Sequence, residues 1–409
     1  MGIGLNVVNG ERKVFWTLCL MGAFAILSST MAKNPVLWPF ASSLGATTEW
    51  KGVIQAASTI PGILVSLPAA SLSDVIGRKR FLILAGIVFA SAPFLYMIIT
   101  VWWQLILVRF YHGFATAIFV PVAEASVAEL YPTKRGERIS LFSSATYVGR
   151  VAAPLLGGYI LFVTDWSFRL LYLAVGVAGV TALVTGLAFL AERKEKSSGV
   201  EERTKHETIR SMFRGWVTVA GNHGVLVASF VQACQYYAYG AVEIFLVGYL
   251  LNVVGLDAFS TGIGMASLIA VPIVTRPYMG RVSDKVGRRI VIAAGCVVGG
   301  LPLAAIPFIT AFPLLLLLAV AYGVGYAMVV ASTPALVSEL VPQYVGTSMG
   351  FLDMLMDVGQ TIGPVVTGLI SATVLSYQGS FPALTAVLLF SCLVFGLSGA
   401  GKMRRRPEE

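Results

Sequence analysis

The sequence predicts an all-α integral membrane protein in which 12 transmembrane helices form two pseudo-symmetric bundles of six. Two observations lead to this fold class. Hydrophobic residues make up 57% of the 409 residues and charged residues only 12%, whereas soluble proteins average about 45–50% and about 25%. In addition, a charged motif around residue 74 returns around residue 284, so the chain consists of two related repeats.

The apolar segments justify the helices one by one, because a helix of roughly 20 apolar residues crosses the hydrocarbon core of a bilayer. The expected spans are 14–40, 53–72, 81–100, 102–130, 138–162, 168–190, 216–251, 259–279, 290–309, 312–338, 345–372 and 381–401. The first lacks the small-residue cleavage site of a signal peptide. We therefore interpret it as the first transmembrane helix.

The repeat is defined by the strings ASLSDVIGRKR at 70–80 and GRVSDKVGRR at 280–289. A constant offset of 210 residues pairs these strings and continues through later helices and loops, where it matches glycines and prolines. The sequence therefore predicts an N-terminal bundle at 1–190, a charged cytoplasmic linker at 191–214 and a C-terminal bundle at 215–409.

The basic residues predict the topology. The chain carries a net charge of +9, and 23 of its 29 lysines and arginines lie before the first span, in alternate loops or in the tail. This asymmetry follows the positive-inside rule, so we expect a multi-pass protein of the plasma or inner membrane with both termini in the cytoplasm. The charge is a topology signal and does not indicate nucleic acid.

Two equivalent groups of charged residues and glycines are candidates for a cytoplasmic gate. An acid and several bases on a short turn can form contacts in one conformation and release them in another, although these bases could serve only as topology anchors. Asp74 can also face the positive N-terminal end of the eleventh helix. The candidates are Asp74, Gly77, Arg78 and Glu129 in the first repeat, and Asp284, Gly287, Arg288 and Glu339 in the second.

Small residues on the fifth and eleventh helices predict close helix packing. The fifth helix contains GRVAAPLLGG at 149–158, and the eleventh contains GQTIGPVVTG at 359–368. Proline within such a helix bends it. The packing residues are Gly149, Pro154, Gly157, Gly158, Gly359, Gly363 and Pro364.

Ionisable residues inside membrane spans are costly and usually face the bundle interior. Arg109 could hold an anion, set the pKa of a nearby proton carrier or form a fixed structural ion pair. Glu124 is a candidate protonation site, or alternatively a member of a salt bridge at the inner end of its helix. Asp353 and Asp357 share one helix face, so we expect them to titrate as a coupled pair suited to proton coupling. Alternatively, one aspartate forms a permanent pair with Arg150.

The 210-residue offset makes Lys33 equivalent to Glu243. Because these opposite charges lie near the outer ends of pseudo-symmetric helices, they are candidates for an outer gate. Each side chain could instead extend to the membrane surface.

Amide and aromatic side chains on the seventh and tenth helices are candidates for a substrate cavity, because they suit the binding of amphipathic organic molecules. They could equally be packing residues. The candidates are Gln232, Gln235, Tyr236, Tyr322 and Tyr326, together with Arg109 and Arg150.

These motifs resemble those of the major facilitator superfamily over nearly the whole chain. The string at 280–289 fits the superfamily's G-x-L-x-D-R/K-x-G-R-R/K loop signature closely, whereas the first copy departs from it at Ala70 and Val75. Arg109 and Gly113 resemble its RxxxG pattern, and 149–158 resembles the GxxxGPxxGG signature of the drug:proton antiporter branch, with Ala153 in place of one glycine.

The resemblance implies a secondary active transporter that works by alternating access, with proton-coupled efflux of small organic or drug-like molecules as the first hypothesis. Proton-coupled uptake of an organic anion is the alternative, and a membrane sensor that transports nothing is a remote one. The chain lacks a GxxxxGK[ST] nucleotide motif and an HExxH catalytic motif. We therefore expect no enzyme activity, no cofactor and no metal, a proton gradient as the energy source, and a monomer in the bilayer.

Overall fold

The computed structural model describes residues 2–131, 133–190 and 217–399, and the regular elements within these ranges are all helical. The predicted linker at 191–214 lies outside the described residues. The first half contains α1 (Gly2–Met31), α2 (Leu37–Ser43), α3 (Thr48–Ala57), α4 (Ile60–Ile76), α5 (Arg78–Tyr96), α6 (Trp102–Leu130), α7 (Arg135–Val163) and α8 (Phe168–Leu190).

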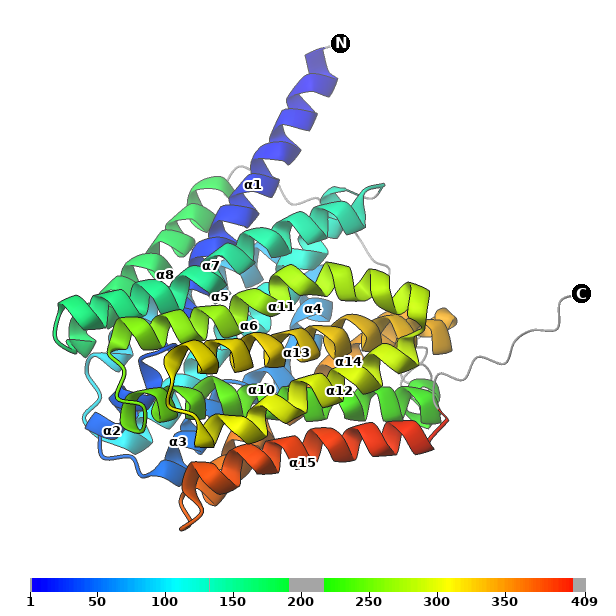
Figure 1. The fold of residues 1–409 in the computed structure, drawn as a ribbon. Coiled ribbons are helices and arrows are strands. Elements are labelled where there is room, and N and C mark those ends of the chain that lie inside the picture. The colour runs from blue at the N-terminus through cyan, green and yellow to red at the C-terminus, as the bar shows by residue number, and fades with distance from the viewer. Residues whose placement is uncertain (1, 132, 191–216, 400–409) are drawn as a thin grey trace, which may run out of the picture. The chain divides into compact units, whose positions relative to one another are not determined.

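In the second half, residues 217–221 are helical and are followed by α10 (Figure 1). The elements from α10 on are α10 (His223–Asn252), α11 (Ala258–Val286), α12 (Arg288–Ala305), η1 (Ile306–Phe308), α13 (Phe312–Leu340), η2 (Pro342–Tyr344), α14 (Val345–Ser371) and α15 (Ser376–Leu397).

Within the described ranges, 9 helices are long and apolar enough to cross a membrane: α1, α5, α6, α7, α8, α11, α12, α13 and α15. Three further predicted spans correspond to α4, α10 and α14. Helix α4 has 17 residues, whereas α10 and α14 are longer and carry amides and carboxylates that lower their mean hydropathy. The polar residues that single out these two helices are therefore also the candidates for function.

The first expected span, 14–40, is wrong at its end. Helix α1 stops at Met31, residues 32–36 form a turn, and α2 follows. Pro35 has no N–H to donate, and it disfavours the helical conformation of the residue before it. Lys33 consequently lies in the turn after α1 rather than within the helix.

The second expected span, 53–72, is interrupted. Helix α3 ends at Ala57 and α4 starts at Ile60, which leaves Ser58 and Thr59 between them. Pro61 occupies the first turn of α4, where its missing N–H costs nothing but prevents continuation of the preceding helix. The break places the polar groups of Ser58 within the bundle.

The chain forms two compact units. The first consists of Met1–Gly199 and Glu243–Ala266, and the second of Val200–Val242 and Ser267–Glu409. In the first unit, α1 packs against α7 and α8, and α5 packs against α6 and α8 (Figure 1). Phe15, Phe89 and Phe119 are fully buried in its core.

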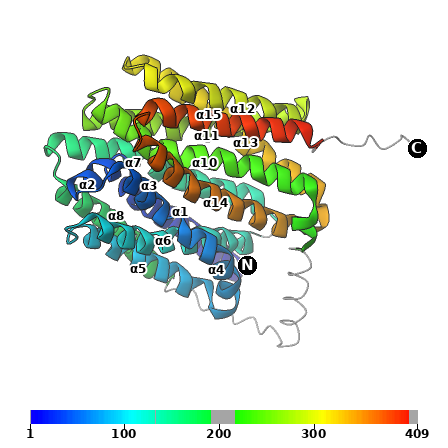
Figure 2. The ribbon, with the colours of Figure 1, turned by 90° about the horizontal axis from the view of Figure 1, so that it is seen from below.

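In the second unit, α12 packs against α13 and α15 (Figure 2). Val231, Ile292 and Phe395 are fully buried in its core. Many large apolar side chains on the long helices of both units remain exposed, as a lipid-facing surface requires. The division at 190 and 215 inferred from the repeat stays a prediction, because the compact units group Glu243–Ala266 with the first half.

Candidate functional site

The carboxylate of Glu243, on α10, contacts three polar side chains, and all four residues belong to the first unit. Lys33 Nζ lies 2.7 Å from Glu243 Oε1, Asn34 Nδ2 donates to the same oxygen at 3.1 Å, and Gln55 Nε2 donates to Oε2 at 2.9 Å. We call these four residues the Glu243 network. Because Glu243 is only 2% exposed, removing Lys33 would leave a buried charge uncompensated, at a cost of about 3–5 kcal/mol.

Arg109 lies on α6 at the break between α3 and α4. Its Nη2 donates to Ser58 Oγ at 2.6 Å and to Gln55 Oε1 at 3.5 Å. The close approach depends on Gly113, where a Cβ atom would lie 2.3 Å from the carbonyl oxygen of Ser58. Arg109 is 2% exposed, and in the described residues its Nε has no hydrogen-bond partner.

Gln55 connects Arg109 to the Glu243 network. A carboxylate can only accept hydrogen bonds and a guanidinium can only donate them, so the two partners fix the orientation of the Gln55 amide. Its nitrogen faces Glu243 and its oxygen faces Arg109. One neutral side chain therefore links two buried charges.

A second polar cluster lies near Arg109 and consists of Tyr96 on α5, His112 on α6 and Tyr172 on α8. The Tyr96 hydroxyl is 3.2 Å from His112 Nδ1, and the Tyr96 ring stacks on Tyr172 with centroids 4.5 Å apart. The Tyr172 hydroxyl donates to the carbonyl oxygen of Ala32 at 3.4 Å. His112 is 2% exposed, and its Nε2 lacks a partner in the described part of the chain.

The sequence predicted both Arg150 and Glu124 as functional residues, but only Arg150 lies near the buried charges. Arg150 on α7 is partly buried, its guanidinium carbon lies 5.9 Å from the Tyr147 ring, and it acts electrostatically on Lys33 and Glu243. Glu124 is partly buried on α6, about 22 Å along the helix axis from Arg109. The structure therefore groups Arg150, but not Glu124, with the buried charges.

The small residues of α7 lie where other backbones approach closely. A Cβ on Gly149 would lie 2.2 Å from the Ala23 carbonyl oxygen, and one on Gly158 would lie 2.6 Å from that of Ala258. Gly157 faces the Asn34 carbonyl oxygen, at 3.2 Å from a built Cβ, and a Cβ on Gly262 would meet the Pro154 carbonyl oxygen at 2.3 Å. The motif therefore seats α7 against α1, the following turn and the first part of α11.

The equivalent small residues of α14 pack against α10 within the second unit. A Cβ on Gly359 would lie 2.1 Å from the Ala233 carbonyl oxygen, and one on Gly363 would lie 2.0 Å from that of Tyr237. Pro364 is buried directly after this contact. The two motifs thus perform the same packing task in the two units.

Asp353 and Asp357 lie on successive turns of α14. Asp357 is partly buried and Asp353 is exposed. Neither carboxylate has a hydrogen bond or an ion pair within 217–399 of the second unit. Ionisable residues within membrane helices often mark proton pathways, and the expected proton-coupling role of these two acids stays a prediction.

The amide and aromatic candidates come together within the second unit. Tyr236 and Tyr322 both contact the Tyr326 ring, with centroids 5.5 and 6.4 Å away. Gln232 accepts a hydrogen bond from Thr333. Gln235 is fully buried, and neither polar atom of its amide has a partner in the described residues.

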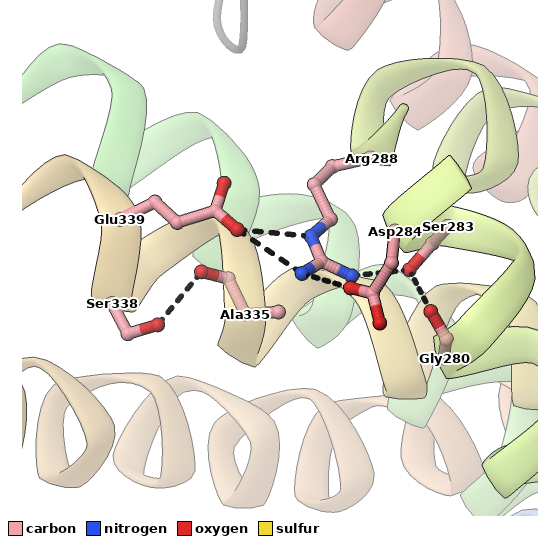
Figure 3. A network of polar contacts seen from close by, with 7 residues as sticks. All are labelled: Gly280, Ser283, Asp284, Arg288, Ala335, Ser338 and Glu339. Atoms are coloured by element: carbon pink, nitrogen blue, oxygen red, sulfur yellow. Dashed lines mark hydrogen bonds and ion pairs between the residues drawn. The ribbon is translucent and has the colours of Figure 1, made fainter. Parts of the chain in front are cut away.

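The loop between α11 and α12 forms a charged cluster (Figure 3). Arg288 pairs with Asp284, donates to Glu339 on α13 through Nε and Nη2 at 3.1 Å, and donates to Ser283 Oγ at 2.6 Å. Gly287 has φ +105°, a conformation that strongly favours glycine.

The first-repeat loop repeats part of this arrangement. Arg78 Nε lies 3.5 Å from Glu129, and Gly77 has φ +110°. Asp74 lies on α4, but its side chain is outside what the structure describes, so its expected role stays a prediction. These exposed pairs contribute only about 0–1 kcal/mol each.

Three residues that contact Glu243 or Arg109 were not expected from the sequence: Asn34, Gln55 and Ser58. The available signal was polarity within an apolar segment, since Gln55 and Ser58 fall inside the span expected at 53–72. Their contacts depend on the turn after α1 and on the α3–α4 break, which place them beside Glu243 and Arg109.

Comparison with known proteins agrees with this architecture. A family profile described as "Major Facilitator Superfamily" matches residues 18–274 and 228–409. The multidrug resistance protein MdtG of Enterobacter lignolyticus is 24% identical over 407 residues, which cover 96% of this chain and 93% of that protein. The multi-drug resistance efflux pump PmrA of Streptococcus pneumoniae serotype 4 is 25% identical over 389 residues, with 91% and 92% coverage.

Solved structures show the same fold. A bacterial homologue of the human lysosomal transporter Spinster superposes with a TM-score of 0.81 at 16% identity and covers 98% of this chain and 99% of its own. The nucleoside transporter NupG superposes with a TM-score of 0.77 at 13% identity, with 94% and 99% coverage. The chain is therefore a member of the major facilitator superfamily, a family of membrane transporters and not of enzymes.

Proposed function

We propose that the protein exports small organic molecules in exchange for protons and works by alternating access, with both termini in the cytoplasm. The observation that carries the proposal is the pair Asp353 and Asp357. A proton-coupled carrier needs an acid that can gain and lose a proton inside the membrane, and neither carboxylate has a basic partner among the described residues of its own unit.

Two further features support this function. The buried contact between Lys33 and Glu243 is suited to an outer gate, because it must break whenever α10 moves away from the turn after α1. The relatives named as multidrug resistance proteins and efflux pumps favour export over uptake. Gln232, Gln235 and the neighbouring tyrosines are the proposed substrate contacts within the second unit.

Proton-driven uptake of an organic anion is the second candidate. It is favoured by the basic residues grouped around Glu243, namely Lys33, Arg109 and Arg150. The two functions use the same fold and the same acids and differ in the direction of substrate movement relative to the protons.

Transport in proteoliposomes under an imposed pH gradient tests the proposal. The panel consists of a cationic dye, a neutral amide and an organic carboxylate. Movement of any of the three compounds against the proton flow supports export. Movement of the carboxylate with the protons, while no compound moves against them, supports the second candidate. Movement of no compound, despite correct insertion, would favour a membrane protein that does not transport.

The variant Asp357→Asn separates coupling from binding. The amide keeps the size of the side chain but cannot exchange a proton, so gradient-driven transport should fall at least tenfold while substrate binding in detergent stays within about twofold. Ser371→Ala, on the same helix, is the matched control. Unchanged pumping by Asp357→Asn would remove this acid from the mechanism.

A further inference from the structure

The strongest unexplained feature of the first unit is the charge of Arg109. A guanidinium is always protonated in proteins, and burying it without a counter-charge costs several kcal/mol. Arg109 is 2% exposed, and its partners Ser58, Gln55 and Tyr96 are all neutral. The contacts among the described residues of the unit therefore leave its positive charge uncompensated.

Glu243 does not supply the missing charge. Its carboxylate is already engaged by Lys33, Asn34 and Gln55, and Gln55 stands between it and Arg109. Arg150 adds a third positive charge that acts on the same group. In this described group, Lys33, Arg109 and Arg150 therefore share one acid, Glu243.

Two buried nitrogen atoms on α6 also lack partners. Arg109 Nε and His112 Nε2 are both without hydrogen bonds in the described residues, and positions three apart lie on adjacent parts of one helix surface. Buried polar groups are almost always hydrogen-bonded, so such exceptions call for an explanation. Guanidinium groups form their strongest hydrogen bonds to carboxylates and phosphates, and a phosphonate presents the same kind of anionic oxygen as a phosphate.

We propose that Arg109, together with His112, binds an anionic oxygen group of the transported molecule, either a carboxylate or a phosphonate. The inference rests on the proposed transport function, because it specifies a chemical feature of the substrate. It holds for export and for uptake alike. The uncharged remainder of the substrate is not specified by these residues.

Equilibrium binding to the purified full-length protein in detergent tests the proposal without any gradient. The probes are benzoate and phenylphosphonate, their neutral and cationic analogues benzamide and benzylammonium, and sodium chloride. Isothermal titration and the thermal unfolding midpoint report binding, because a ligand of the folded state stabilises it by mass action. We expect at least one of the two organic anions to bind at least tenfold more tightly than benzamide and benzylammonium.

Variants then locate the site. Arg109→Gln should weaken anion binding at least tenfold, Arg109→Lys should retain part of it, and His112→Gln should weaken it by a smaller factor. Arg169→Gln, the same change at an exposed arginine, should have no effect. Comparison of the wild-type protein with the matched probes keeps the test valid if an Arg109 variant fails to fold.

Three outcomes would overturn the proposal. These are equal binding of the neutral or cationic analogue, unchanged anion binding by folded Arg109→Gln, and stabilisation by chloride alone with no competition from the organic anions. Recovery of folding and transport when Arg109→Gln is combined with Asp357→Asn would also overturn it, because the guanidinium would then have a counter-ion in the protein. Failure of proton coupling in liposomes, with anion binding intact, would remove only the proposed function.

Discussion

At the scale of single residues, the first unit is organised by hydrogen-bond direction. Gln55 presents a donor to Glu243 and an acceptor to Arg109, so neither buried charge can move without disturbing the same amide. A leucine at this position would fill a similar volume but leave both charges without that partner. The amide therefore connects the Lys33–Glu243 pair to the proposed anion-binding residues.

Reversal of the Lys33–Glu243 pair tests the outer gate. Lys33→Glu and Glu243→Lys each place like charges 2.7 Å apart in the wild-type geometry, and each single variant should reduce transport more than tenfold. The double variant restores opposite charges and should recover a substantial part of the rate. Transport of a labelled substrate into or out of proteoliposomes measures the effect.

A charge reversal at an exposed site provides the control for that experiment. Arg169→Glu changes the net charge of the chain as Lys33→Glu does, but it should leave transport within about twofold. If the double variant recovers nothing while both singles insert normally, the pair has no gating role.

The sequence predicted part of this residue-level arrangement. The repeat offset identified Lys33 and Glu243 as equivalent, and their side chains do meet. The repeat carried no information about Asn34 or Gln55, because their positions depend on where α1 ends and where α3 breaks. Pro35 and Pro61 decide both points locally, whereas the contacts that result span much of the chain.

At the scale of helices, glycine determines how closely α10 and α14 approach. Gly359→Ala would place a methyl group 2.1 Å from the Ala233 carbonyl oxygen, so one helix must shift. We expect a loss of about 1–3 kcal/mol in the free energy of unfolding, measured by thermal unfolding in detergent with intrinsic fluorescence.

Gly346→Ala is the matched control on the same helix, because a Cβ there meets no atom within 4 Å. Alanine is the better helix former by up to about 1 kcal/mol, so this variant should be neutral or slightly more stable. Equal destabilisation by the two variants would show that the contact with Ala233 does not limit stability.

Helix boundaries followed the sequence least well at the predicted outer side of the first repeat. Long apolar segments such as 102–130 matched α6 directly, because composition alone specifies a spanning helix. The segment from Ala32 to Thr59 did not, since apolar content continues through two turns that prolines and polar residues impose. The site uses this irregular segment, and hydropathy is least informative there.

At the scale of the whole molecule, two six-helix repeats account for the fold family. The apolar segments and the 210-residue offset predicted it, and the profile match and both superpositions confirm it. A repeat identifies equivalent helices but not the contacts they make. It therefore could not indicate that Glu243–Ala266 groups with the first compact unit.

The orientation of the chain can be tested with single cysteines. All four native cysteines are buried or partly buried, so they should react slowly. Thr47→Cys, before α3, should react with a membrane-impermeant maleimide in intact cells, and Thr133→Cys, before α7, should react only after permeabilisation. The opposite pattern would contradict the orientation predicted from the basic loops.

The two loop glycines, Gly77 and Gly287, give the equivalent loops of the two repeats a similar backbone conformation. Both turns use nearly the same backbone angles, with φ of +110° and +105°, so residues 280–289 have a main chain suited to replace residues 70–79 in a chimera without redirecting the next helix. Divergence between the copies, such as Val75 against Lys285, is then confined to side chains. The same turn geometry therefore carries different side chains in the two repeats, so the surfaces of the two loops can differ while the backbone path stays the same.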